Sequence, residues 1–427
     1  MRALIHRLST HPKYSRVFEW GKVISIAGSA QILVQLTGLL TGILIIRMLP
    51  TKEYAFYTLA NTMLSTMTVL ADGGISAGAM AQGGKVWKDR QQLGLVLATG
   101  LDLRKKFAIF SLLVAVPILV YLLWHQGASL WVIVLVVATL IPSFYAALSD
   151  SLLEIVPKLH QDIKPLQMNQ VMVNIFRLLL SASAVLFPFT FIVLLANGIP
   201  RMYGNFKLRK IVEKFAEPEL QPDPVYRDNI MQVVKRMMPG SIYYCISGQM
   251  TIWLLSIFGS TDSIAKIGAL GRISMLLTIF TVLFGTLITP RFARLAEDKA
   301  VLLKRFVTIQ VGMVILCTAI CTLIYFVPQP ALWLLGDKFK GLEMELTLSI
   351  LASCLALMSG LFFGLSSSRG WPTHPVVLIV GNVVFVVTGA LLFDVSSLMG
   401  ALWFNIFINL YPVVIHSLNF YYKAFKK

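Results

Sequence analysis

The stretch from Leu130 to Ser149 reads LWVIVLVVATLIPSFYAALS and contains no charged side chain. A helix rises about 1.5 Å per residue, so about 20 apolar residues are needed to cross the roughly 30 Å hydrocarbon core of a bilayer. A helix satisfies all its backbone hydrogen bonds internally, as a segment surrounded by lipid requires. This stretch therefore predicts a transmembrane helix.

The rest of the chain has the same character, since 57% of its 427 residues are apolar and only 13% are charged. Soluble domains contain about 25% charged residues, so we expect an all-α polytopic membrane protein. About twelve apolar segments are long enough to span, and a break is expected where two of them meet at Phe187-Pro188. The predicted spans are residues 23–46, 54–81, 107–124, 130–149, 166–186, 187–204, 238–259, 264–289, 306–327, 342–365, 374–394 and 396–420.

The net charge of +17 would favour nucleic acid as the partner of a soluble protein, but the positions of the basic residues point to membrane topology instead. With twelve spans and both termini in the cytoplasm, 30 of the 37 Lys and Arg residues lie in cytoplasmic segments. This agrees with the positive-inside rule. We therefore expect a multi-pass protein of the inner (cytoplasmic) membrane that binds no nucleic acid.

A polar stretch in the middle of the chain separates two sets of six predicted spans. We expect an N-terminal half at residues 1–210, a cytoplasmic linker at 211–236 and a C-terminal half at 237–427. Two parallel repeats with equal span counts are typical of transporters, in which the halves rock around a central site. This arrangement predicts two six-helix bundles around a central cavity.

Polar side chains recur on one face of several predicted spans, at spacings of three and four residues. Lipid contact would cost such groups several kcal/mol, so we expect them to line the cavity, although a single hydroxyl can bond back to its own helix and paired glycines can serve helix packing. The four stripes are Gln31, Gln35, Gly38 and Gly42; Asn61, Ser65, Thr68 and Asp72; Gln170, Asn174, Arg177 and Ser181; and Ser274, Thr278, Thr281 and Gly285.

Charged residues within spans are hypotheses for function. Asp72 is our candidate for ion coupling, to either protons or sodium. Arg177 requires a partner, which we expect to be a carboxylate such as Asp72 or Asp150, or an anionic cargo. Arg47, Lys266 and Arg272 lie near the outer ends of spans, where they could also reach the lipid headgroups.

Three segments resemble a known family. Residues 47–60 (RMLPTKEYAFYTLA) are similar to a signature of bacterial polysaccharide flippases, which belong to the multidrug/oligosaccharidyl-lipid/polysaccharide exporter superfamily. Residues 70–76 (LADGGIS) and 289–295 (TPRFARL) resemble that family's ends of the second and eighth helices. Ala55 replaces the family's usual glycine, and no glycine separates Leu49 from Pro50.

This resemblance implies ion-coupled flipping of an undecaprenyl-diphosphate-linked oligosaccharide to the periplasmic leaflet, for O-antigen, capsule or exopolysaccharide assembly. It also implies membrane lipids and polysaccharide polymerase or assembly proteins as partners. Arginine recognises phosphate through two parallel bonds, and amides bind sugar hydroxyls. We therefore expect the cargo to contact Arg47, Arg177, Lys266, Arg272, Gln31, Gln35, Asn61 and Asn174.

Two other functions compete with this hypothesis. A multidrug or cation antiporter of the same superfamily would need an acidic cavity, whereas basic residues predominate in and near these spans. A membrane glycosyltransferase, ligase or polymerase would need acidic or His groups on a large outer loop, and the largest expected outer loop is residues 328–341. We predict no enzyme activity, catalytic residue, cofactor or metal site.

Overall fold

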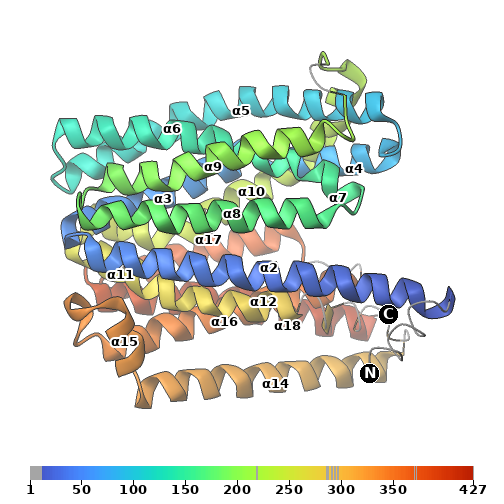
Figure 1. Ribbon diagram of the computed structural model, residues 1–427. Helices are drawn as coiled ribbons and strands as arrows, with labels where there is room; N and C mark the ends of the chain where they lie inside the picture. Colours follow the sequence, from blue (N-terminus) through green and yellow to red (C-terminus); the bar gives the residue numbers. More distant parts are fainter. Residues whose placement is uncertain are drawn as a thin grey trace, which may run out of the picture. The chain divides into compact units, whose positions relative to one another are not determined.

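The computed structural model describes residues 12–426 except 218–219, 285–287, 290–291, 293–294, 296–297, 370 and 372 (Figure 1). Within these residues the chain forms helices joined by short connections, with no strand. The longer helices are α2 (Pro12–Met48), α3 (Thr51–Asp72), α4 (Ile75–Val86), α5 (Arg90–His125), α6 (Leu130–Leu153), α8 (Ile163–Ser181), α9 (Thr190–Val212), α10 (Pro224–Phe258), α11 (Thr261–Ser274), α14 (Lys299–Phe326), α16 (Glu343–Ser368), α17 (Pro375–Leu392) and α18 (Leu398–Lys426). The shorter ones are α7 (Ile155–Leu159), α12 (Thr278–Leu283), α15 (Gln329–Leu335) and the 3-10 turns at Ala182–Val185, Met275–Leu277 and Asp337–Phe339.

Each of the twelve predicted spans overlaps one of these helices. In the described part of the chain, eight helices are long and apolar enough to cross a bilayer, and Ile32–Met48 is a shorter apolar helix. The chain is therefore an all-α polytopic membrane protein, as predicted. The other three predicted spans lie in α3, α9 and α10, which are helical but carry more polar residues, so the count of twelve stays a prediction.

The connection between α8 and α9 was predicted from the sequence, whereas the connection between α3 and α4 was not. The expected break near Phe187-Pro188 is confirmed, because α8 ends at Ser181 and α9 begins at Thr190. The span predicted at 54–81 is instead divided into α3 and α4 by Gly73 and Gly74, whose φ angles are 48° and 101°. Glycine adopts such positive φ values without the steric cost that other residues meet.

The chain divides into two compact units, each of which we describe by itself. Unit 1 comprises residues 1–49, 63–121 and 128–245, and unit 2 comprises 50–62, 122–127 and 246–427. Helices α3, α5 and α10 therefore each contribute to both units. In unit 1, α8 packs against α2 and α9, and α9 also packs against α6, as the parallel ribbons of Figure 1 show.

The interior of unit 2 is built around α16, which packs against α18, α14 and α11. Phe306 and Phe420 stack with their ring centroids 3.8 Å apart, and Gln310 Nε2 donates to Ser417 Oγ at 2.9 Å. Large apolar side chains lie on the outside as well, for example Leu391, which is 83% exposed. Such exposure is costly in water but suits a helix that faces lipid tails.

The close packing of α8 on α9 depends on Gly204. A Cβ atom at this position would lie 2.3 Å from Val173 Cγ2 of α8. Gly38, one of the paired glycines expected to serve helix packing, behaves differently, because no described atom lies within 4 Å of a Cβ placed on it. The four-residue spacing of such a pair shows only that two glycines share a helix face, and the partner helix decides whether that face is tightly packed.

Replacing Gly204 by alanine should therefore destabilise unit 1. Overpacking a tight interface costs about 1–3 kcal/mol, because valine has few alternative rotamers through which to withdraw. We expect a lower midpoint of thermal unfolding for Gly204→Ala in detergent. Gly312→Ala on α14 is the control, since no described atom lies within 4 Å of its Cβ position. Equal midpoints for the two variants would contradict this account of the packing.

Candidate functional site

Asp72 is the last residue of α3 and lies at the centre of a polar cluster in unit 1. Its Oδ1 accepts hydrogen bonds from the backbone N–H of Ser76 at 3.1 Å and from Ser76 Oγ at 2.8 Å. Arg104 of α5 donates to the same carboxylate, and also to the carbonyl of Leu148 and the hydroxyl of Ser151 on α6. Arg104 is 3% exposed, so its charge is balanced inside the protein.

The sequence pattern alone did not identify Arg104. The predicted topology places it among the cytoplasmic basic residues from Lys85 to Lys106, because the next span is predicted to begin at 107. In the structure α5 begins at Arg90, so Arg104 lies more than three turns into a helix and not in a loop. One signal was present: Leu101 and Leu103 continue the apolar pattern up to Arg104.

A second cluster in unit 1 surrounds Asp150 near the end of α6. Arg201 Nε donates to Asp150 Oδ2 at 3.1 Å, and Asn205 Nδ2 donates to Asp150 Oδ1 at 2.7 Å. One turn further, Glu154 accepts from Lys158 Nζ at 2.7 Å and from Gln170 Nε2 at 2.9 Å. Each of the carboxylates Asp72, Asp150 and Glu154 is therefore bonded to a cation.

The polar stripe of α8 is directed toward helices of its own unit. Asn174 Nδ2 donates to the carbonyl of Gln170 within the helix, and Arg177 Nε donates to Asn197 Oδ1 of α9 at 2.6 Å. The two carboxylates that we considered as partners of Arg177 are bonded to other arginines. Asp72 pairs with Arg104 and Asp150 pairs with Arg201, because these arginines project from the helices that pack beside them.

The remaining predicted residues of the N-terminal half lie on α2 and α3. Arg47 is exposed in the last turn of α2, and Gln35 is half-buried on the same helix. Gln31 belongs to α2, but its side chain lies outside the described part of the structure. Asn61 is half-buried on α3, within unit 2, while Ser65 of unit 1 is exposed.

Lys266 and Arg272 lie on α11 in unit 2. Lys266 pairs with Asp262 one turn earlier at 2.5 Å. Arg272 lies over the ring of Tyr57, with its guanidinium carbon 5.8 Å from the ring centroid and Nη2 3.5 Å from the hydroxyl. Residues 50–62 are part of the same unit, and Thr58 lies against Gly268 so closely that a Cβ there would be 2.5 Å from its hydroxyl.

The polar residues of the predicted eighth span are only partly described. Ser274 Oγ lies 3.2 Å from Ser349 Oγ of α16, and Thr278 at the start of α12 donates to the carbonyl of Met275 in the preceding 3-10 turn at 2.7 Å. Gly285 and four residues of the family-like segment, Pro290, Arg291, Ala293 and Arg294, lie outside the described residues. Among the residues that are described, no three His, Cys, Asp or Glu side chains are grouped as metal ligands would be.

No protein-family model matches the sequence, and no curated protein matches it. Solved structures do match. An inward-facing multidrug resistance MATE family transporter of the MOP superfamily is 13% identical, with a TM-score of 0.73 over 92% of this chain and 94% of that one. An outward-facing transporter of the same description is 15% identical, with a TM-score of 0.64 over 98% of this chain and 97% of that one.

A third match is a MOP superfamily transporter from Pyrococcus furiosus, for which a binding pocket of reverse polarity is described. It is 15% identical, with a TM-score of 0.60 over 95% of this chain and 93% of that one. At these identities the likeness shows that the chain shares the fold of these transporters over nearly its whole length. The superfamily printed for these neighbours is the one to which the resemblance in sequence points.

The Asp72–Arg104 pair should contribute measurably to stability. Removing one member of a buried ion pair leaves the other uncompensated, so Asp72→Asn and Arg104→Gln should each lower the midpoint of thermal unfolding. The double variant should be less destabilised than the two losses added together, by a coupling energy of about 1–3 kcal/mol. Additive losses in this double-mutant cycle would show that the contact contributes little.

Proposed function

We propose that this protein is a flippase that moves a lipid-linked oligosaccharide, carried on a diphosphate, across the inner membrane by alternating access. The fold supports the class of activity, because both inward- and outward-facing transporters share it over nearly the whole chain. The proposal places both termini in the cytoplasm, in agreement with the distribution of Lys and Arg.

Our choice of an anionic cargo rests on the ion pairs that the carboxylates of unit 1 form. Asp72, Asp150 and Glu154 are bonded to Arg104, Arg201 and Lys158, so their negative charge is offset locally. A cavity that attracts a cationic drug needs a net negative field, whereas an anionic cargo needs cations with donors to spare. Because the negative charge of these carboxylates is compensated by ion pairing, an anionic cargo is favoured over a cationic one.

Arg272 is the strongest candidate for contacting the diphosphate. Tyr57 offers it a neutral hydroxyl and an aromatic face, which orient the guanidinium without cancelling its charge. A planar guanidinium keeps further N–H groups with which to bind phosphate oxygens in pairs. We propose that Arg47 and Arg177 add positive charge along the path, and that Lys266 does so when it separates from Asp262. We propose that Gln31, Gln35, Asn61 and Asn174 bind sugar hydroxyls.

Asp72 remains our candidate for ion coupling, and its ion pair with Arg104 limits how it can bind an ion. A proton or sodium ion can bind this carboxylate only in competition with Arg104, which donates to it. Coupling would therefore require the two side chains to separate during the cycle. The 29% exposure of Asp72 leaves one side of the carboxylate accessible for such an exchange.

The alternative is a multidrug antiporter. It is favoured by a specific observation, because two of the structural matches are described as multidrug resistance transporters. The two functions require opposite cargo charges. Deleting the gene separates them: loss of surface polysaccharide with intracellular accumulation of lipid-linked oligosaccharide supports the flippase, and a change in drug susceptibility alone supports the antiporter.

Arg272 allows a sharper test. Arg272→Gln removes the charge, and we expect it to reduce polysaccharide export at least about tenfold, since a charged hydrogen bond contributes about 1.5–3 kcal/mol. Arg272→Lys keeps the charge but loses the planar fork, so it should restore only part of the export. Export would be measured as surface polysaccharide per unit of protein in the membrane.

Lys340→Gln is the matched control for this series. It makes the same change in charge within unit 2, at a side chain that is 72% exposed and paired only at the surface with Asp337. The control should export at the wild-type rate. If Arg272→Gln also exports normally while present at normal abundance, Arg272 does not contact the cargo.

A further inference from the structure

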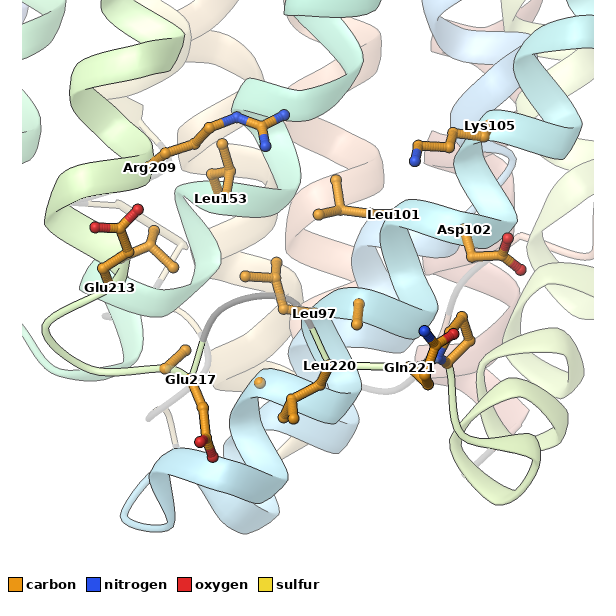
Figure 2. Close-up of a pocket in the computed structure, with 15 residues that line it drawn as sticks. Leu97, Leu101, Asp102, Lys105, Leu153, Arg209, Glu213, Glu217, Leu220 and Gln221 are labelled. Atoms are coloured by element: carbon orange, nitrogen blue, oxygen red, sulfur yellow. The ribbon is translucent and has the colours of Figure 1, made fainter.

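A pocket of about 500 Å³ lies within unit 1, between α5, α6, α9 and the described parts of the connector that follows α9, residues 213–217 and 220–223 (Figure 2). Its walls combine leucines with five charged residues, Asp102, Lys105, Arg209, Glu213 and Glu217. Neither the Asp72 cluster nor any residue that we propose for the cargo lines it. The pocket therefore needs an explanation separate from transport.

Specific contacts hold the connector that closes the pocket. Arg90 Nη2 donates to the carbonyl of Glu213 at 2.6 Å, and the N–H of Glu217 donates to the carbonyl of Arg90 at 3.1 Å. Further along, the N–H of Asp223 donates to Thr99 Oγ1 at 2.9 Å. Gly94 permits this close approach, because a Cβ there would lie 2.6 Å from the carbonyl oxygen of Glu217.

The charges lining the pocket form two layers. On α5, Lys105 follows Asp102 by three residues, and on α9, Arg209 precedes Glu213 by four. The apolar part of α5 follows Lys105 and that of α9 precedes Arg209, so on both walls the cation lies about one turn, or roughly 5 Å, closer to the apolar part of the helix. Each acid lies on the polar side.

The two cations are available to a ligand. Figure 2 shows Arg209 and Lys105 extending from opposite walls toward the space between them. No described carboxylate lies within ion-pair distance of either side chain, and Asp102 pairs instead with Lys106 at 2.7 Å. Arg209 donates to two neutral groups, Asn205 Oδ1 and Ser149 Oγ, each at 3.2 Å.

Exposed apolar side chains continue from the cation layer. Ile109 and Leu113 follow Lys105 at four-residue spacing on α5 and are 55% and 70% exposed. Residues at this spacing share one face of a helix. On α9, Phe206 precedes Arg209 by three residues and is 56% exposed. A ligand held by the cations would therefore have an apolar surface next to it.

We propose that this pocket binds the headgroup of a bilayer phospholipid that carries a primary ammonium group, of the phosphatidylethanolamine type. The phosphate lies between Lys105 and Arg209, the ammonium donates to Glu213 and Glu217, and the acyl chains lie along Ile109 and its neighbours. The order of the layers matches the order of groups in such a lipid: chain, phosphate, amine.

This assignment distinguishes among lipids by their headgroups. Phosphatidylglycerol has the phosphate but no cation for the acid layer, and phosphatidylcholine has a quaternary nitrogen that donates no hydrogen bond. The two layers together therefore select a primary amine. The site is independent of the cargo, so its occupancy can be measured whether or not the proposed transport is correct.

Native mass spectrometry of the full chain in detergent tests the proposal. The probes are phosphatidylethanolamine, phosphatidylglycerol and phosphatidylcholine with identical acyl chains, together with water-soluble phosphoethanolamine. Wild-type protein should bind phosphatidylethanolamine about tenfold more tightly than either other lipid, which corresponds to one charge-assisted bond. Phosphoethanolamine alone should bind more weakly than the lipid, because it has no chains.

Three variants locate the site. Lys105→Gln should weaken phosphatidylethanolamine and phosphatidylglycerol binding alike, whereas Glu213→Gln combined with Glu217→Gln should abolish only the preference for phosphatidylethanolamine. Ala98→Phe fills the pocket without changing charge and should weaken both lipids. Lys164→Gln, at an exposed lysine of unit 1 that does not line the pocket, is the matched control and should bind as wild type.

Several results would overturn the assignment. One is equal binding of the three lipids by the wild-type protein. Another is the same lipid affinity in Lys105→Gln, Ala98→Phe and Lys164→Gln. Free phosphoethanolamine binding as tightly as the lipid would show that the pocket takes a soluble phosphate compound and not a membrane lipid.

Discussion

The ion pair between Arg104 and Asp72 is the interaction on which the arrangement of unit 1 depends most. The guanidinium of Arg104 donates to Asp72 at the end of α3, to Ser76 at the start of α4 and to the carbonyl of Leu148 on α6. One side chain of α5 therefore joins three other helices. The bonds that its two Nη atoms donate offset the cost of burying this charge, while Nε has no partner among the described residues. The positions of these helix ends are therefore coupled to one another.

The break at Gly73-Gly74 makes this pair possible. It ends α3 at Asp72 and turns the chain so that the N–H of Ser76 reaches back to the carboxylate. A continuous helix through this region, as the apolar pattern predicted, would have used that N–H within its own ladder. The two glycines therefore interrupt the helix. The interruption allows the carboxylate of Asp72 to accept hydrogen bonds from both Ser76 and Arg104.

The fold was largely predictable because the bilayer imposes a length and a composition on each span, and both are visible in one sequence. The break before α9 was predictable for a similar reason, since Pro188 lacks a backbone donor. Charge pairing was not predictable in the same way. Arg104 and Lys105 are adjacent and chemically alike, yet one is buried against Asp72 and the other lines a pocket, because consecutive helix positions point about 100° apart.

The same limit explains why the polar stripes were only a partial guide to the site. Helical spacing shows that Gln170, Asn174 and Arg177 share a face, but it does not show which neighbour that face meets. In the structure, Arg177 bonds to Asn197 of α9 and Gln170 bonds to Glu154. A stripe can thus satisfy the polar groups of its own unit as readily as it can line a passage.

The excess of positive charge has more than one physical role. Loop lysines and arginines are enough to explain orientation in the membrane. Arg104, Arg201 and Lys158, however, are bonded to acids that would otherwise make unit 1 attractive to cations.

Lys105 and Arg209 face a pocket whose acids lie one helical turn away on the polar side. The cations of the first group are paired with acids within the protein. The cations of the second group lie about one helical turn from the acids that line the same pocket. The second arrangement therefore produces a field with a direction. Such a field can orient a ligand whose charges follow the complementary order, with its anionic group at the cations and its cationic group at the acids.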